Sequence, residues 1–305
     1  MKNRYASIDV GTNSIRCLMA KIENGQLVEA EKKLEMTRIG EGVNATKMLQ
    51  PERILSSTNA IKKFVDEAKA FLAQDIFIMA TSAVRDAENR AVFLNSVKEA
   101  TGYDVDVISG KQEADIGFKG VIAGAIAPER MKLVVDIGGG STEFIVGNIE
   151  GIAFSKSINI GAVRMTNMFG RDYSAMSDFI DEQLKPIVPF ISDGKTFDVI
   201  GIGGTATTFL TMFKKIEHYK RELVHNQMIT CRDIEVINKQ LRGLTLEEKK
   251  NLPGLDPKRA DIIEAGGVIL SRVMHWARSE NMIISDYDNL EGYLFYCLEN
   301  PQNRR

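Results

Sequence analysis

The chain has 305 residues, of which 39 are Lys or Arg and 41 are Asp or Glu, so its formal net charge is −2. This balance excludes the excess of positive charge that draws proteins onto DNA or anionic lipid, and we expect neither nucleic acid nor a membrane as a partner. The composition, 44% hydrophobic and 26% charged, is that of a globular protein. The length exceeds what one core usually covers, which predicts two domains.

Three cysteines, Cys17, Cys231 and Cys297, lie far apart and form no CxxC spacing. This usage is typical of a reducing compartment and not of a disulfide framework. Asp9 interrupts any signal peptide, and no apolar run approaches the roughly 18 residues of a membrane span. We therefore expect a cytoplasmic location.

The first part of the chain predicts a meander of three strands followed by alternating helices and strands. The strands are YASID, IRCLMAKI and QLVEAEKKL within residues 5–34, separated by the turn VGTNS and by a hairpin signal at 23–25. Apolar residues at helical spacing follow Pro51, and then come a strand at 76–80, a turn and helix start near Arg85, a strand at 105–108 and a helix from 109.

The same order starts again at Lys132, with the strands LVVDI, TEFIVGNI and IAFSKSI. Aligning DVGTNS with DIGGGS places Asp9 on Asp136, an offset of 127 residues (136 − 9). Because the strand order repeats along with the turn, the sequence indicates duplication of a whole lobe. Two further strands, at 197–201 and 282–285, alternate with helices, so the class is α/β.

Three strands end in turns rich in Gly, Ser and Thr: 9–16, 136–143 and 201–208. Successive backbone amides of such a turn can bind one phosphate group, and the alternative for each is a tight structural turn. Asp136 and Glu143 bracket the second turn and suit Mg²⁺, which prefers one or two carboxylates besides phosphate oxygens and water. Asp9 is the equivalent acid of the first turn. The alternative to metal binding is structural. Each Asp would then accept hydrogen bonds from its own turn, and Glu143 would be solvated.

Two further residues are candidates for binding a phosphoryl group or acting on it chemically. Arg85, in ATSAVRDAEN, could bind it bidentately or be a surface arginine. Glu113 lies in the first turn of a predicted helix, where the helix dipole alone favours an acid. Ser109 and Gln112 fit a capping box that begins this helix.

These motifs together resemble the exopolyphosphatase/guanosine pentaphosphate phosphatase family, within the superfamily of actin, sugar kinases and heat-shock chaperone ATPases. Seven blocks in family order carry the resemblance: DVGTNSIR, TSAVRDAEN, ISGKQEA, VVDIGGGSTEF, IGAVRMT, IGIGGTATT and LDPKRADII. The resemblance implies two ribonuclease-H-like, actin-like lobes with mixed sheets and an active site in the cleft between them. The boundary follows from the break in the pattern at GAIAPER, which predicts a first lobe at 1–124 and a second at 125–289. The resemblance implies that a C-terminal helix at about 290–305 packs back on the first lobe.

The resemblance also implies a reaction, hydrolysis of the terminal phosphoanhydride bond of inorganic polyphosphate or of guanosine pentaphosphate with Mg²⁺. Glu113 would activate water beside Arg85, and Asp136, Glu143 and Asp9 would bind the metal. The phosphate-binding positions would be Thr12, Asn13, Ser14, Arg16, Gly138, Gly139, Gly140, Ser141, Thr142, Gly204 and Thr205.

The sequence departs from the family pattern at Lys111 and Gln112, where acids are usual, at Asn167 in place of Glu, and at Leu290 in place of Arg. The helical HD-type domain of longer relatives is not expected, and a homodimer is plausible by resemblance alone. A non-catalytic sensor of polyphosphate or of the guanosine alarmone, and less so a small-molecule kinase, stay open as alternatives.

Overall fold

The computed structural model describes residues 3–191 and 197–300. The chain divides into two compact units, Met1–Gly120 with Asn289–Arg305, and Val121–Asp288. The lobe limits expected from the sequence stay a prediction, and the last five residues of the helix expected at 290–305 lie outside the described residues. No helix of the described ranges is both long and apolar enough to cross a membrane.

The first unit contains a five-stranded mixed sheet in the order β3-β2-β1-β4-β5. β1 and β2 form an antiparallel pair, as do β2 and β3, and β4 runs parallel to β1. The strands are β1 Arg4–Val10, β2 Ile15–Glu23, β3 Gln26–Glu35, β4 Asp75–Ala80 and β5 Asp106–Val107. The helices are α1 Val43–Thr46, α2 Pro51–Ala70, α3 Ser82–Arg85, α4 Arg90–Thr101, α5 Gly110–Gly124, which continues into the second unit, and α13 Asn289–Glu299.

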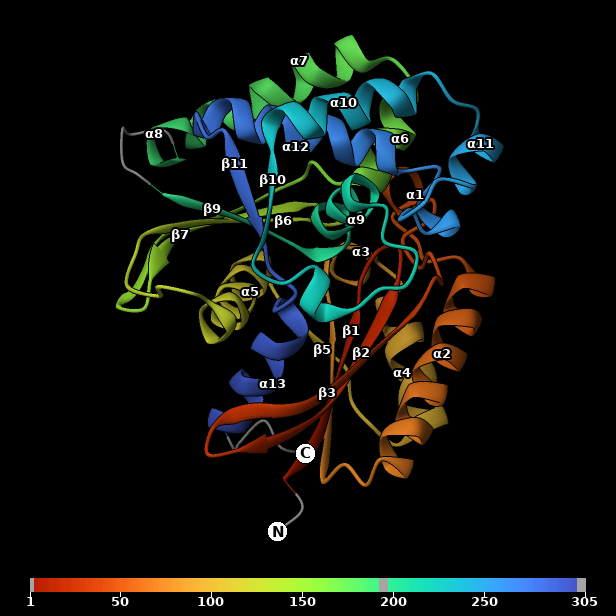
Figure 1. Cartoon of the computed structure of the whole chain (residues 1–305). Coiled ribbons are helices and arrows are strands. Elements are labelled where there is room, and N and C mark those ends of the chain that lie inside the picture. Colours follow the sequence, from red (N-terminus) through yellow and green to blue (C-terminus); the bar gives the residue numbers. More distant parts are fainter. Residues whose placement is uncertain (1–2, 192–196, 301–305) are drawn as a thin grey trace. The chain divides into compact units, whose positions relative to one another are not determined.

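Alternation along the strands of this sheet builds two apolar layers. In β2, Cys17 and Met19 belong to the cluster under α2 and α4, whereas Leu18 and Ala20 belong to the cluster under α13. A period of two is what a strand with both faces covered requires. Figure 1 shows α2 and α4 side by side on one face of the sheet and α13 on the other.

The second unit contains a six-stranded mixed sheet in the order β10-β11-β9-β6-β7-β8. The strands are β6 Lys132–Ile137, β7 Thr142–Asn148, β8 Gly151–Ile158, β9 Asp198–Ile202, β10 Gln227–Thr230 and β11 Asn281–Ile284. The helices are α6 Ala162–Phe169, α7 Tyr173–Leu184, α8 Val188–Ile191, α9 Gly203–Lys214, α10 Cys231–Arg242, α11 Leu246–Lys250 and α12 Ile263–Ala277, with 3₁₀ turns at Lys185–Ile187, Arg221–Leu223 and Pro257–Arg259.

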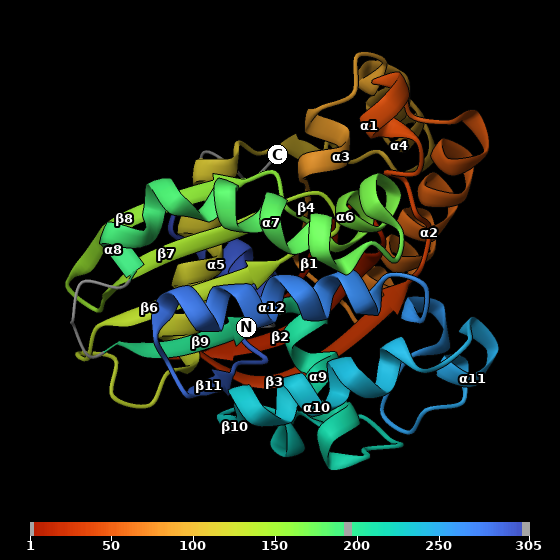
Figure 2. The same cartoon turned by 90° about the horizontal axis from the view of Figure 1, so that it is seen from above.

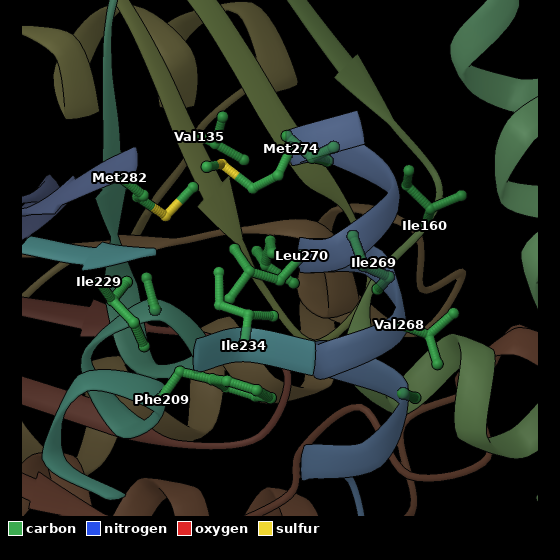
Figure 3. Packing of buried hydrophobic residues seen from close by; sticks show 14 of the residues in the cluster. Val135, Ile160, Phe209, Ile229, Ile234, Val268, Ile269, Leu270, Met274 and Met282 are labelled. Carbon is green, nitrogen blue, oxygen red and sulfur yellow. The ribbon is translucent and has the colours of Figure 1, made fainter. Parts of the chain in front are cut away.

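Helices α7, α10 and α12 cover one face of this sheet (Figures 1 and 2). Leu270 and Met274 of α12 pack among Val135 of β6, Phe209 of α9 and Ile234 of α10 (Figure 3). All five side chains are at most 1% exposed, and burying a side chain of this size stabilises the fold by about 1.5 to 3 kcal/mol.

The duplication predicted from the sequence is confirmed. The meander β6-β7-β8 with the parallel strand β9 repeats the meander β1-β2-β3 with the parallel strand β4.

Two details of the secondary structure differ from the sequence-based expectation. Strand β10 was not expected, because its four residues QMIT are too few for a periodic signal. Arg85 ends the four-residue helix α3 and does not begin a helix.

Candidate active site

The glycine turn of the first unit follows β1 and is closed by one backbone hydrogen bond. The Gly11 N–H donates to the carbonyl oxygen of Ser14 at 3.0 Å. Asp9 pairs with Arg16 across the two strands, and Arg16 donates to one carboxylate oxygen of Asp9 from Nε at 3.2 Å and from Nη2 at 2.5 Å. Asp9 is thus held by an ion pair within its own hairpin, in which both side chains are mostly buried.

The turn of the second unit repeats this geometry at the same offset of 127 residues. The Gly138 N–H donates to the carbonyl oxygen of Ser141, also at 3.0 Å, and Asp136 faces Glu143 across the strands. Where the first unit has an arginine opposite its acid, the second unit therefore has another acid. Both are buried, at 8% and 2% exposure, and Glu143 accepts a hydrogen bond from Ser157 Oγ at 2.7 Å.

A second segment orients the peptide groups of each turn. In the second unit the carbonyls of Gly138 and Gly139 accept from the N–H groups of Ala162 and Arg164 at 2.9 and 3.0 Å, and Arg164 Nε donates to the carbonyl of Gly140 at 2.7 Å. In a trans peptide the N–H points opposite to the C=O. The amides of the three following residues, Gly139 to Ser141, therefore point away from this segment, as a phosphate cradle requires.

The first unit has the same arrangement. The carbonyls of Thr12 and Asn13 accept from the N–H groups of Gly40 and Arg38 at 2.9 and 3.0 Å, which turns the amides of Asn13 and Ser14 the other way. These orienting segments were missed by the sequence analysis. The signal that could have found them is the dipeptide Ile-Gly, which follows the third strand of each meander at 39–40 and at 160–161.

Glycine is required in both dipeptides because the segments approach the turns closely. A Cβ on Gly40 would lie 2.2 Å from Thr12 Cγ2, and a Cβ on Gly161 would lie 2.3 Å from the carbonyl oxygen of Gly139. Either contact is far inside van der Waals distance, so a side chain at either position would displace the turn.

The third turn, between β9 and α9, touches the acid of the second turn. Gly203 has φ +73°, and a Cβ on it would lie 2.3 Å from Asp136 Oδ1. The N-terminus of α9, a helix of 12 residues, thus adjoins this carboxylate at Gly203. The next residue, Gly204, is close to the guanidinium of Arg259, where a Cβ would lie 2.0 Å from Nη1.

Two of the expected phosphate-binding hydroxyls have structural partners instead. The Thr205 hydroxyl donates to the carbonyl of Ile137 at 3.1 Å, and the Thr142 hydroxyl donates to the carbonyl of Ile160. A hydroxyl has a single proton to donate. The Thr205 hydroxyl therefore ties the start of α9 to β6, the Thr142 hydroxyl ties β7 to the segment after β8, and neither donates to a phosphate in this arrangement. In the first unit Thr12 Oγ1 lies 2.9 Å from Ser82 Oγ, at the start of α3.

Arg85 and Glu113, 28 residues apart in the sequence, are in contact. Arg85 Nη1 donates to Glu113 Oε2 at 3.0 Å and to the carbonyl of Ile108 at 3.1 Å. The Glu113 side chain is 8% exposed and that of Arg85 21%. The predicted capping box is confirmed, since Gln112 N donates to Ser109 Oγ and Ser109 N to Gln112 Oε1. Glu113 therefore stands at a fixed place in the first turn of α5.

The acids of the second turn fit a magnesium ion. No three His, Cys, Asp or Glu side chains gather into a metal site within residues 3–191 and 197–300. Asp136 and Glu143 alone supply two buried carboxylates at one strand end, and Mg²⁺ takes its other ligands from water and phosphate.

Two mixed sheets, with a repeated glycine turn beside buried acids and an Arg–Glu pair whose carboxylate is buried, define a class of phosphate-handling enzymes. A model of the Ppx/GppA phosphatase family matches residues 18–300. The chain belongs to this family.

Two curated relatives and one solved structure show how similar this chain is to known proteins. A bifunctional 3-dehydroquinate synthase/phosphatase of Fusobacterium nucleatum is 36% identical over 98% of this chain, which spans 47% of that relative's length. Exopolyphosphatase 2 of Mycobacterium tuberculosis is 29% identical, over 95% of this chain and 97% of its own. The crystal structure of an exopolyphosphatase from Cytophaga hutchinsonii has a TM-score of 0.88 at 28% identity, covering 97% of this chain and 98% of its own.

These similarities confirm the actin-like ATPase fold and the family expected from the sequence motifs. The family is one of phosphatases, and relatives named exopolyphosphatase and guanosine-5'-triphosphate,3'-diphosphate pyrophosphatase are phosphoanhydride hydrolases. Leu290 proves to be a core residue of the first unit, 1% exposed and in the cluster under α13.

Proposed function

We propose that the protein hydrolyses the terminal phosphoanhydride bond of linear inorganic polyphosphate and releases orthophosphate, with guanosine pentaphosphate as a second substrate. The contact between Arg85 and Glu113 is the observation that carries this proposal. A carboxylate held by an arginine at a helix start, in a chain that also carries two turns whose amides are oriented outward, supplies the groups that phosphoryl transfer to water needs.

In this reaction Glu113 accepts a proton from the attacking water, whose oxygen forms a bond to the terminal phosphorus. The bond from that phosphorus to the bridging oxygen breaks, and its electron pair stays on the shortened chain. Arg85 binds the phosphoryl oxygens, and the amides of Asn13, Ser14 and Gly139 to Ser141 bind the phosphate groups. Asp136 and Glu143 would hold Mg²⁺, which neutralises phosphate charge when bound.

We assign Asp9 a smaller role in metal binding and Arg16 a smaller role in phosphate binding, because the two side chains neutralise each other's charge. A non-catalytic sensor is not favoured, because Glu113 and Arg85 are both present and in contact. The position of the active site between the lobes, a homodimer, and the lack of a nucleic-acid partner stay predictions. Sedimentation velocity would test the dimer.

The test is phosphate release with Mg²⁺ from long-chain polyphosphate, guanosine pentaphosphate and ATP by the wild type and by Glu113→Gln. We expect the substitution to lower release by a factor of about 10² to 10⁴, the usual contribution of a general base. Glu99→Gln, an exposed acid on α4, is the matched control and should leave the rate unchanged. Full activity in Glu113→Gln, or no release from any of the three substrates by the wild type, would overturn the proposal.

A further inference from the structure

A cavity of about 160 Å³ lies in the second unit, on the face of its sheet opposite to α7, α10 and α12. Asp198 and Ile200 of β9 and Ile283 of β11 line this cavity. Val199 and Met282, their neighbours along these strands, belong to the core on the helical face. Since one water molecule takes up about 30 Å³, the cavity has room for about five waters or for a compact organic ligand.

Most of the cavity wall is apolar and is formed by Val121, Ala125, Ile126, Ile200 and Ile283. Val121 lies in the last turn of α5, and Ala125 follows the helix directly. With Gly124 between them, this end of the helix carries short side chains and leaves the space open. A ligand that removes this wall from water needs a hydrocarbon body of its own.

The first unit shows that the fold itself requires neither a cavity nor a lysine here. The offset of 127 residues places Tyr5 on Lys132, and the strand pairing has the same register in both sheets, so that Phe77 corresponds to Ile200. Tyr5 and Phe77 pack in the apolar cluster under α13. The same place in the repeat is therefore occupied by two aromatic side chains.

Lys132, which lines the cavity, is 1% exposed. Its Nζ donates to the carbonyl of Ala127 at 2.9 Å and lies 3.4 Å from Asp198 Oδ2. Ala127 has φ +51°, a left-handed conformation that is uncommon for a residue other than glycine. Burying an ammonium group is more costly than burying an apolar side chain of similar size. Because the repeat uses such a side chain, we attribute Lys132 to the charge that it supplies.

The charged residues of the lining leave one positive charge in excess. Arg130 Nη2 lies 3.0 Å from Asp198 Oδ1, on the carboxylate that Lys132 already neutralises from the other side. Two cations and one acid line the cavity, which gives 2 − 1 = +1. The Arg130 side chain is 55% exposed, and a guanidinium has more N–H donors than one carboxylate oxygen accepts. Arg130 is thus the group that can bind an incoming anion.

We propose that this cavity binds a small aliphatic monocarboxylate, with the hydrocarbon against Val121, Ile200 and Ile283 and the carboxylate on the guanidinium of Arg130. Lys132 has a positioning role, since it neutralises Asp198 and so leaves Arg130 to the ligand. Polyphosphate carries charge but no hydrocarbon, so this site is separate from the proposed hydrolysis and does not depend on it.

The test titrates isovalerate into the wild-type protein and follows binding by saturation-transfer NMR. We expect a Kd of about 1 mM, the range open to a ligand of this size. Isovaleramide has the same shape without the charge, and isopentylamine has the opposite charge. Both should bind about 10-fold more weakly or worse, because they lose the charged hydrogen bond. Tripolyphosphate should not displace isovalerate.

Arg130→Gln should lower the affinity for isovalerate about 10-fold or more, for the same reason. Lys98→Gln is the matched control, because Lys98 is also exposed and also pairs with one aspartate, Asp104, at 2.8 Å in the first unit. This variant should bind isovalerate as the wild type does. Melting temperatures measured without ligand show whether each variant is folded.

Two further variants fill the cavity. Ile200→Phe copies Phe77 of the first unit, and Ala125→Leu lengthens the wall at the end of α5. A folded variant of either kind should not bind isovalerate, and unchanged binding would overturn the proposal. No binding by the wild type, equal affinity for isovaleramide, or unchanged affinity in Arg130→Gln would do the same. Arg130→Gln alters an exposed residue and keeps the test decisive if both filled variants fail to fold.

Discussion

Two features require glycine at position 203: its φ of +73° and the close approach of Asp136. A left-handed φ costs a residue with a Cβ about 1 to 2 kcal/mol, and the contact at 2.3 Å adds the displacement of a carboxylate on which the proposed metal site depends. The sequence motif identified this turn, whereas the contact with Asp136 came only from the structure.

We expect Gly203→Ala to lower phosphate release at least 10-fold, because the Asp136 carboxylate must move. Gly151→Ala is the control, since Gly151 also has a positive φ, +146°, but has no atom within 4 Å of the added Cβ. Both variants should lose stability in urea unfolding because of the positive φ, but only Gly203→Ala should lose rate. Equal rates in both would contradict the assigned contact.

The buried thiols predict how stability depends on pH. Burial raises the pKa of Cys17 and of Cys297 from an ordinary value of 9.0 to about 12. The thiols stay protonated in the folded chain after they ionise in the unfolded one. Their contribution to stability is therefore complete below pH 9 and is lost as the pH rises toward 12.

Each thiol should lower the free energy of unfolding by about 1.4 kcal/mol per pH unit above 9. The measurement is urea unfolding at pH 8 and pH 10 for the wild type and for Cys17→Ala with Cys297→Ala. The double variant should be less stable at pH 8 but show a flatter pH dependence. An equally steep fall in both proteins would refute the assignment to these cysteines.

At the scale of elements, one carboxylate joins two helices of the second unit. Asp181 of α7 accepts two hydrogen bonds from Arg272 of α12, each of 2.6 Å, and a third from Trp276 Nε1 at 2.9 Å. The bidentate geometry fixes how α7 lies on α12, beside the apolar core shown in Figure 3.

Asp181→Ala should destabilise the protein by about 2 to 3 kcal/mol, because it leaves Arg272 and Trp276 without this partner. Asp178→Ala, an exposed acid on the same helix, should change stability by less than about 0.5 kcal/mol. Denaturant unfolding measures both. Similar values for the two variants would show that the bidentate pair contributes little.

At the scale of the whole molecule, the chain returns to its first unit through α13. Tyr293 donates to Asp106 Oδ2 at 2.6 Å, and Lys32 forms an ion pair with the fully buried Glu291 at 2.9 Å. The apolar side of the helix covers Leu18 and Phe77 of the sheet. The first unit is therefore completed only by residues from the far end of the sequence.

A chain that ends at Asp288 should expose this face, bind the dye ANS and aggregate, because a contiguous apolar surface becomes accessible to water. Tyr293→Phe keeps the helix and should cost only about 1 to 2 kcal/mol, through the lost hydrogen bond to Asp106. Soluble expression, light scattering and melting temperature compare the two. A shortened chain that stayed monodisperse with the wild-type melting temperature would contradict this account of α13.

The sequence by itself determined the α/β class, the duplicated meander, the three glycine turns, the family and the capping box before Glu113. These features are local, since alternation, turn residues and short motifs act over a few neighbouring residues. Strand β10 was missed for the same reason, because four residues in an edge strand take their conformation from the strand beside them.

Only the tertiary structure decided which donors and acids already have partners. It paired Asp9 with Arg16 and Arg85 with Glu113, and turned the hydroxyls of Thr142 and Thr205 toward the backbone. These outcomes depend on how close residues distant in sequence come to one another, and no periodicity along the chain encodes that distance. Hydrogen bonds act only over about 3 Å, so a site's partners are settled by packing.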